Sequence, residues 1–357
     1  MQKKNSNAPA GVKEIARLAN VSIATVDRVI HKRGGVSEET EKKIAEIIDR
    51  LGYQPNILAQ RLALASRGII RLAALLPTVS EETEFWQAPL DGINRAESEI
   101  KQYGIHVERY FFDQNDPQSF AKEVRRLSKS DADGILFTPI FPEESMRLIK
   151  TLEKRGTPYV VINSDIPGYD SLGYIGPEIF HSGYLAGQLL NYCIKGGQPV
   201  LVAKIAAEIG NNYAILRKEE GFRAYFADNR LTNPLLSLDT TQTDYSSIAR
   251  KLDRLLKEQP DTGAIFVTNS RVSLVARYLE KAKRTGIILL GYDFTKENVT
   301  FLKNGVIDFL ICEKPQEQGY RGIMTLFQHL VLTTPIEKKY LMPIDIITKE
   351  NYLFYRN

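Results

Sequence analysis

A short stretch near the N-terminus, residues 21–37, carries side chains suited to contact a polyanion. Small residues and hydroxyls come first, and Arg28 and the basic run 31–33 follow. Hydroxyls donate hydrogen bonds to phosphate oxygens, and an arginine can bind guanine O6 and N7 with two hydrogen bonds. Asp27 places a negative charge in the middle of this stretch.

A second set of polar and aromatic residues follows short apolar runs later in the chain. These segments are residues 78–86, 111–116, 138–141, 162–165, 267–270, 291–294 and 311–319. Amides and carboxylates can bind the hydroxyls of a sugar or polyol, and the C–H face of a sugar can stack on an aromatic ring. Two simpler interpretations stay open: such loops are polar in any α/β protein, and Trp86, the only tryptophan, could be an ordinary core residue.

Three short helices are expected to position the first set. The helix over 12–19 has one apolar stripe, and Asn20 can end it in a left-handed turn. Ser22 can cap a second helix that turns Val26 inward, and a third helix starts at Ser37. Two short helices with a tight turn and a supporting third helix predict a helix-turn-helix over 11–53, although other three-helix bundles share these periodicities.

The outward face of the second helix has the composition of a DNA-reading surface, apart from Asp27. Asp27 and His31 are spaced i, i+4, so a local charge pair is one interpretation. Pairing with a basic group elsewhere in the same module is similar in kind. A third interpretation is that Asp27 accepts a hydrogen bond from a cytosine amino group. On each of these three interpretations, the negative charge of Asp27 lowers the non-specific attraction of the helix to DNA phosphates.

Residues 54–68 can form a short hinge helix, for which Asn56 is a plausible cap. Leu58 and Leu62 lie on one face, and a helix of this length is marginal in water without a partner. An inter-domain linker with incidental leucines is the alternative interpretation.

From residue 69 onward, apolar runs alternate with helical stretches in two series of five or six strands. This alternation predicts two doubly wound lobes, each a parallel sheet covered by helices. Ligands bind outside the carboxyl ends of strands in such sheets, which is where the polar segments fall. The expected fold is a small all-α head on a two-lobed α/β domain over 69–357.

The stretch "VKEIARLANVSIATVDRVIHKRGGVSEETEKKIAEIIDRLGYQPNILAQRLA", residues 12–63, resembles the lactose-repressor (LacI) family of bacterial transcription regulators. The resemblance implies that Ile23, Ala24 and Arg28 read bases and that Ser22 and Thr25 touch phosphate. It also implies that the hinge segments of two copies pair over the minor groove and that Leu62 wedges into a base step. The family commonly has serine at the position that Asp27 occupies in this sequence. The full expected set of DNA-contacting residues is Ser22, Ile23, Ala24, Thr25, Asp27, Arg28, His31, Asn56, Ala59 and Leu62.

The remaining chain resembles the type I periplasmic sugar-binding fold, closest to its ribose-binding branch. The resemblance implies lobe crossings near Pro177, Glu313 and Leu341. Asn163, Ser164 and Lys218 depart from the family's usual Asp, Arg and Arg, and Asp165 is a candidate to replace the missing arginine. The implied ligand-binding residues are Phe85, Trp86, Asn163, Asp165, Lys218, Asn269, Asp293 and Glu313.

The composition of the chain limits the classes of protein to which it can belong. Residues 1–68 hold 12 Lys and Arg against 7 Asp and Glu, whereas the rest hold 35 against 36, so the basic character lies in the N-terminal fifth. Two cysteines are too few for a disulfide framework or a zinc site. Residues 1–10 look like a disordered arm without the apolar segment of a signal peptide, and no apolar run is long enough for a bilayer. A cytoplasmic chain without cofactor, metal or membrane contact is expected.

These observations predict a homodimeric DNA-binding regulator, most simply a repressor, whose operator affinity responds to a small carbohydrate. No phosphate-binding loop, zinc-protease motif or cysteine pair points to an enzyme, and no catalytic residue is predicted. A carbohydrate-active enzyme fused to the head and a transport receptor are the alternatives.

Overall fold

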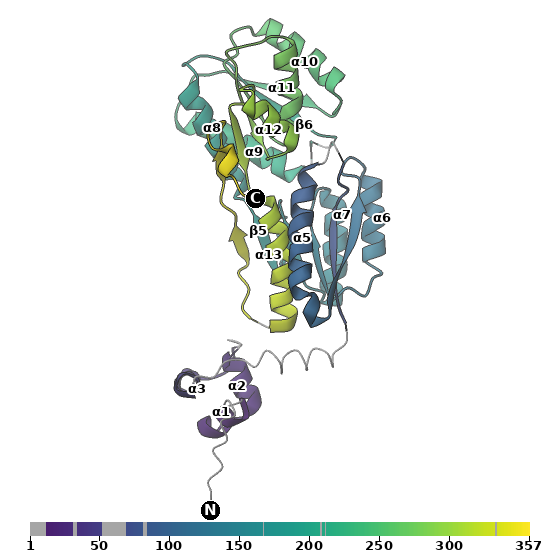
Figure 1. Cartoon of the computed structure of the whole chain (residues 1–357), viewed down its shortest axis with the longest axis vertical. Helices are drawn as coiled ribbons and strands as arrows, with labels where there is room; N and C mark the ends of the chain where they lie inside the picture. The colour runs from purple at the N-terminus through teal and green to yellow at the C-terminus, as the bar shows by residue number, and fades with distance from the viewer. Residues whose placement is uncertain are drawn as a thin grey trace, which may run out of the picture.

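The computed structural model describes residues 12–30, 34–51, 69–80, 84–166, 168–207, 209–210, 212–332 and 334–357 (Figure 1). Several sequence predictions lie outside these residues. They concern the arm over 1–10, the whole hinge over 54–68, and the residues His31, Asn56, Ala59 and Leu62.

The head consists of α1 (Val12–Ala19), α2 (Ile23–Ile30) and α3 (Glu38–Leu51). Asn20 has φ 58°, the left-handed conformation expected after α1. The Ser22 hydroxyl accepts a hydrogen bond from the Thr25 amide at 3.1 Å, which confirms the predicted cap of α2. The apolar stripes of the three helices meet in one small core around Ile15, Val26 and Ile44.

The first lobe is a six-stranded parallel sheet in the order β11-β5-β4-β3-β1-β2. Its strands are β1 (Ile70–Pro77), β2 (Ile105–Phe112), β3 (Gly134–Phe137), β4 (Tyr159–Ile162), β5 (Gly173–Gly176) and β11 (Lys339–Leu341). Its helices are α5 (Gln87–Ile100), α6 (Pro117–Leu127), α7 (Pro142–Arg155) and α13 (Pro315–Phe327). Helices cover both faces of the sheet, so the sequences of its central strands are nearly continuous runs of apolar residues.

The second lobe repeats this plan with the order β12-β10-β9-β8-β6-β7. Its strands are β6 (Val200–Ile205), β7 (Leu235–Thr240), β8 (Ala264–Val267), β9 (Ile288–Tyr292), β10 (Phe309–Cys312) and β12 (Asp345–Ile347). Its helices are α8 (Ile179–Cys193), α9 (Tyr213–Asp228), α10 (Tyr245–Glu258), α11 (Val272–Lys281) and α12 (Lys296–Lys303). The sheet is not wholly parallel as expected, because β12 returns from the first lobe and pairs antiparallel with β10.

One pair of helices in each lobe packs backbone to backbone through glycines. In the first lobe α5 lies beside α13, and in the second α8 lies beside α9 (Figure 1). A Cβ atom on Gly183 would lie 1.9 Å from the carbonyl oxygen of Lys218, and one on Gly221 would lie 1.9 Å from that of Phe180. Glycine is therefore required for this approach, which also sets the position of Lys218.

The chain crosses between the lobes three times, as the resemblance to the periplasmic sugar-binding fold implied. The crossings run from β5 to α8, from β10 to α13 and from β11 to β12. The Tyr174 hydroxyl donates to the Pro177 carbonyl at 2.8 Å and so ties the first crossing to β5. Sequence patterns did not predict β5, β11, β12, α8, α12 or α13. The sequence predicts a strand-end loop over 311–319, but residues 315–319 form the first turn of α13.

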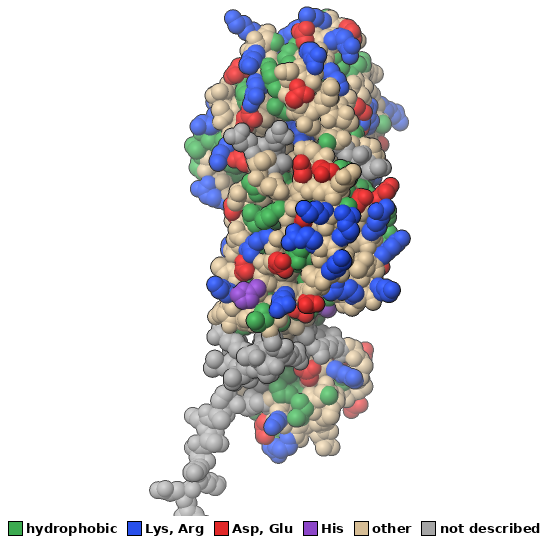
Figure 2. All heavy atoms as spheres, turned by 90° about the vertical axis from the view of Figure 1, so that its right-hand side faces the viewer, with side chains coloured by type: hydrophobic (Ala, Val, Ile, Leu, Met, Phe, Trp, Pro, Cys, Tyr) green, Lys and Arg blue, Asp and Glu red, His purple; other side chains and the backbone are tan. Residues whose placement is uncertain are grey.

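The near-neutral charge of the two-lobed domain is unevenly distributed. Figure 2 shows Lys and Arg side chains gathered on one side of the first lobe, where α6 and α7 lie. Exposed basic residues of this face are Lys122, Arg125, Arg126, Lys129, Arg147, Lys150, Lys154 and Arg155. Within the described part of the chain, no helix has the length and apolar character to cross a membrane.

Candidate functional site

The outward face of α2 exposes the residues predicted to contact DNA. Ser22, Ile23, Ala24 and Arg28 are exposed, with Ile23 at 50%, whereas Thr25 is half-buried. The hydroxyls of Ser22 and Thr25 lie 2.8 Å apart at the start of the helix. The amino-terminal turn of α2 therefore presents hydroxyl, apolar and guanidinium groups on one side. Asp27 lies half-buried on the same helix.

A cavity of about 130 Å³ lies between the two lobes, which we call the inner cavity. Its walls come from the carboxyl ends of strands in both sheets, the place predicted for a ligand. Each of the seven polar segments singled out from the sequence contributes lining residues. In both lobes the sheet order reverses at one strand, β1 or β6, and the segments after these two strands face each other across the cavity.

The first lobe supplies aromatic and amide groups to the inner cavity. Its lining residues are Phe85, Trp86, Gln114, Asn115, Thr138, Pro139, Ile140, Asn163 and Ser164. The rings of Phe85 and Trp86 meet edge to face at 4.9 Å, and the Trp86 indole N–H donates to Gln114 at 3.0 Å. Trp86 is 4% exposed and also packs in the sheet core, so it is both a core residue and a wall of the cavity.

The second lobe supplies a buried ionic network. Glu313, on the second lobe crossing, accepts from Ser182 at 2.6 Å and from the Lys218 ammonium at 3.3 Å. Lys218 also lies 3.5 Å from the centre of the Tyr292 ring. Both charged groups are more than nine-tenths buried, so this hydrogen-bonded pairing offsets much of their desolvation cost. The network leaves a nearly neutral polar wall rather than a cationic one.

Asp293 presents a carboxyl group to the same wall. Loss of solvent on burial raises its pKa to about 7, the Lys218 charge opposes this shift, and the Glu313 charge adds to it. No hydrogen bond reaches its side-chain oxygens from the described residues. A carboxyl near half ionisation that faces a cavity is typical of a ligand-binding site.

Asn163 and Asp293 occupy matching positions after β4 and β9, and both have left-handed backbones, with φ 69° and 75°. Asn and Asp adopt this conformation at lower cost than other non-glycine residues. The backbone N–H of Asn163 donates to Gln318 Oε1 at 2.9 Å, and Gln318 Nε2 donates to the backbone carbonyl of Glu313 at 2.7 Å. The buried Gln318 thus joins a first-lobe cavity loop to a lobe crossing.

Arg271 is a cavity residue that sequence reasoning did not select. Its guanidinium donates to the Ile205 carbonyl at 3.2 Å and, across the lobes, to Asn115 at 3.3 Å. Asn269 was predicted as a ligand residue, and it lines the cavity, but its amide donates to Ile205 and its oxygen accepts from the Arg271 backbone. The position of Arg271 two residues after Asn269 is the only local signal that could have indicated it.

Asp165 does not lie where it was expected. It is absent from the cavity lining, and its carboxyl accepts from the Ile166 amide and lies 3.6 Å from the Lys339 ammonium. The chain turns after Ser164, so Ser164 faces the cavity and Asp165 faces the edge strand β11. Asp165 therefore does not replace an arginine in the cavity.

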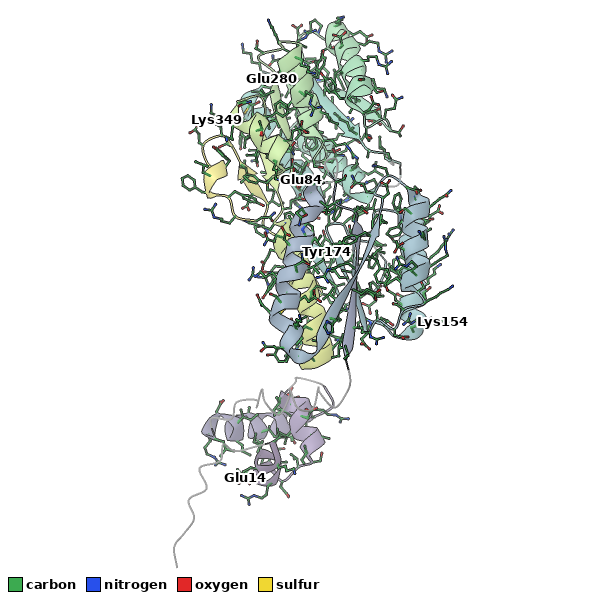
Figure 3. All side chains as sticks on the ribbon, turned by 45° about the vertical axis from the view of Figure 1, so that its right-hand side comes forward. Glu14, Glu84, Lys154, Tyr174, Glu280 and Lys349 are labelled. Carbon is green, nitrogen blue, oxygen red and sulfur yellow. The ribbon has the colours of Figure 1, made fainter. Side chains whose placement is uncertain are left out.

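The lobes also meet outside the inner cavity. Glu84, which lies at the junction of the lobes in Figure 3, accepts from the Lys296 amide at 3.0 Å and faces the Lys296 ammonium at 3.6 Å. Together with the Arg271–Asn115 bond, this contact joins a first-lobe segment to the second lobe.

Comparison with known proteins agrees with both halves of the structure. Residues 11–56 match bacterial regulatory proteins of the lacI family, and residues 73–332 match the periplasmic binding protein domain. The probable HTH-type transcriptional repressor ExuR of Bacillus subtilis is 30% identical over 74% of this chain and 74% of its own. The chain belongs to the lacI family.

Solved structures extend this relationship. A putative LacI transcriptional regulator from Bacteroides fragilis is 29% identical, covers 81% of this chain and all of its own, and has a TM-score of 0.74. GanP, a glucose-galactose binding protein from Geobacillus stearothermophilus, is 20% identical over 79% of this chain and 99% of its own, with a TM-score of 0.71. The second likeness shows the shared fold. As a lacI-family member, this protein is a DNA-binding transcriptional regulator with a small-molecule effector domain.

Proposed function

We propose that the effector is a small carbohydrate that binds in the inner cavity and controls repression of an operator. The observation that carries this proposal is the lining itself. It combines two aromatic rings, Phe85 and Trp86, with amide and carboxyl groups from both lobes. Sugars require both an apolar face and several hydrogen-bonding partners, and an ordinary apolar ligand would leave these polar groups unsatisfied.

The proposed ligand residues are Phe85, Trp86, Asn163, Lys218, Asn269, Asp293 and Glu313, with Arg271 added. We assign Asp293 to accept hydrogen bonds from sugar hydroxyls. The Lys218–Glu313 pair provides hydrogen-bonding groups with no net charge. Phe85 and Trp86 contact the C–H face of the sugar. Asn269 acts mainly by holding Arg271.

Lobe closure links the cavity to DNA in this proposal. A carbohydrate bound by both lobes favours the closed arrangement, because only that arrangement brings all of its contacts together. The three crossings transmit the change to the first lobe and to the segment that precedes β1. The size of the response equals the difference in ligand affinity between the two arrangements, so a ligand that touches one lobe alone would not act.

We further propose that the head, residues 11–53, and the hinge, residues 54–68, act in a homodimer on double-stranded operator DNA. Two recognition helices would enter successive major grooves about 10 bp apart, with Ile23, Ala24 and Arg28 at base edges. Ser22 and Thr25 would contact phosphate. Sedimentation analysis with and without an operator duplex tests the dimer, and a monomer on the duplex would contradict it.

A thermal-shift screen of monosaccharides, sugar acids and polyols tests the effector. An occupied site raises the melting temperature according to the excess of ligand over its Kd. Trp86 is the only tryptophan, so its fluorescence reports events at the cavity wall. Phe85→Ala should abolish the shift, whereas Phe354→Ala, which alters a ring that is 78% exposed and outside the cavity, should not. An unchanged shift in Phe85→Ala would overturn the assignment.

Binding without turnover distinguishes this proposal from a carbohydrate-active enzyme. Glu313 is held by Ser182 and Lys218, which leaves Asp293 as the one cavity carboxyl without a hydrogen-bond partner among the described residues. Paired acid and base carboxylates are the usual requirement for glycoside hydrolysis. Incubation of the purified protein with the sugar that it binds should return that sugar unchanged by chromatography.

A further inference from the structure

A second cavity of about 390 Å³ lies beside the inner cavity, and we call it the outer cavity. Phe85, Ser270 and Arg271 line both. Small-molecule sites commonly enclose about 300–1,000 Å³. The inner cavity alone lies below that range and the outer cavity lies within it, so the two together are better matched to a ligand longer than the inner cavity can hold.

The lining of the outer cavity, like that of the inner one, combines polar side chains with aromatic rings. Hydroxyl groups come from Thr243, Ser270 and Ser273, and an aromatic ring comes from Tyr245. Arg277 donates to Glu297 in a hydrogen-bonded ion pair on the same wall. Hydroxyls, a ring and a partly exposed ion pair can bind a polyhydroxyl group, whereas a purely apolar extension would leave them without partners.

The outer cavity also depends on lobe closure. Glu84 and Phe85 supply its first-lobe wall, and all of its other walls belong to the second lobe. The Glu84 contact with Lys296 lies at the junction of the lobes (Figure 3). A group in the outer cavity therefore touches both lobes and adds to the preference of the ligand for the closed arrangement.

We propose that the effector is a saccharide of at least two linked units, with its terminal unit in the inner cavity and the next unit in the outer cavity. The inference rests on the proposed carbohydrate function and specifies its ligand class. The glycosidic linkage passes between Phe85 and Arg271, where the two cavities share their walls. Phe85 then contacts both units, and the Arg271 guanidinium lies next to the linkage.

Calorimetric titration of the full-length protein tests the ligand class. The probes are D-glucose, D-galactose and D-xylose, with maltose, cellobiose, lactose, melibiose and xylobiose as their two-unit counterparts. We expect at least one disaccharide to bind tenfold or more tightly than the monosaccharide at its end. Monosaccharide binding that no disaccharide exceeds would overturn this inference and leave the carbohydrate function intact. Binding of neither class would overturn both.

A substitution that fills the outer cavity tests the location. Thr243→Trp places a large ring there from a loop and leaves the inner lining unaltered. The affinity for the preferred disaccharide should fall at least tenfold, to that of its monosaccharide, while monosaccharide affinity stays within twofold. Thr241→Trp, on the same loop but outside the lining, is the matched control. Equal loss for both ligands, or no loss for either, would overturn the outer-cavity assignment.

Discussion

Asp293→Asn is expected to stabilise the protein and to weaken its effector binding. Asp293 lines the inner cavity, and burial raises its pKa to about 7 from an ordinary value of 3.8. Asparagine has the same shape and tolerates the left-handed backbone found here, so the exchange removes the charge without new strain. The effect on stability therefore isolates the cost of ionising a carboxyl at this wall.

The sign and size follow from the two pKa values. Between about pH 4 and 7 the folded protein keeps a proton on Asp293 that the unfolded chain has released, so the stability from this group falls as pH rises. At about 1.36 kcal/mol per pKa unit, the full difference sets an upper limit of about 4 kcal/mol above pH 7. Solvent that reaches this half-buried group reduces the effect to about 2 kcal/mol.

Urea denaturation of the full chain at pH 5 and pH 8 measures the effect. The free-energy advantage of Asp293→Asn over the natural protein should grow by about 1–2 kcal/mol from pH 5 to pH 8. Asp261→Asn, at an exposed turn outside the cavity, is the control and should show no such growth. Carbohydrate affinity of Asp293→Asn should fall at least tenfold at pH 8, because an amide replaces an acceptor-only carboxylate.

Two results would refute this reasoning. An advantage of equal size at both pH values would mean that the Asp293 carboxyl is not desolvated. Unchanged carbohydrate affinity would mean that it does not contact the ligand. The two outcomes are independent, so each tests one half of the argument.

Three further predictions concern the head and the lobe crossing. Arg28→Ala should cost about 1–3 kcal/mol of discrimination between the operator and a single-base variant, measured by fluorescence anisotropy; equal loss on both duplexes would exclude base reading. Asp27→Ser should raise the affinity for random DNA, and unchanged binding across a salt series would reject this. Gln318→Leu removes the hydrogen bonds to the backbone N–H of Asn163 and the backbone carbonyl of Glu313. The free energy of unfolding, measured in urea, should therefore fall by about 1–3 kcal/mol for each buried group left without a partner. An unaltered urea midpoint would show that water or a shifted backbone satisfies both groups.

Local signals in the sequence were enough to predict the three helices of the head and most elements of the two lobes, but not β5, β11, β12, α8, α12 or α13. A left-handed Asn20 and a capping Ser22 mark the turn of the head, because each acts on atoms within a few residues of itself. The alternation of apolar runs and helical stretches predicted two wound lobes, and the polar segments after those runs do line the cavity. Parallel strands place their carboxyl ends at the same edge of a sheet. The position of a residue just after a strand was therefore enough to predict that it lies near the ligand site.

The residue pattern alone was thus sufficient to predict the fold class, the helix-turn-helix and the edge of the sheets where a ligand would lie. Which side chains meet at that edge depends on how the chain packs in three dimensions. Lys218 and Glu313 are 95 residues apart, and Arg271 and Asn115 are 156 apart. Asp165 turned to Lys339, although its neighbour Ser164 faces the cavity. Such partners depend on lobe packing and loop direction, which no local periodicity encodes.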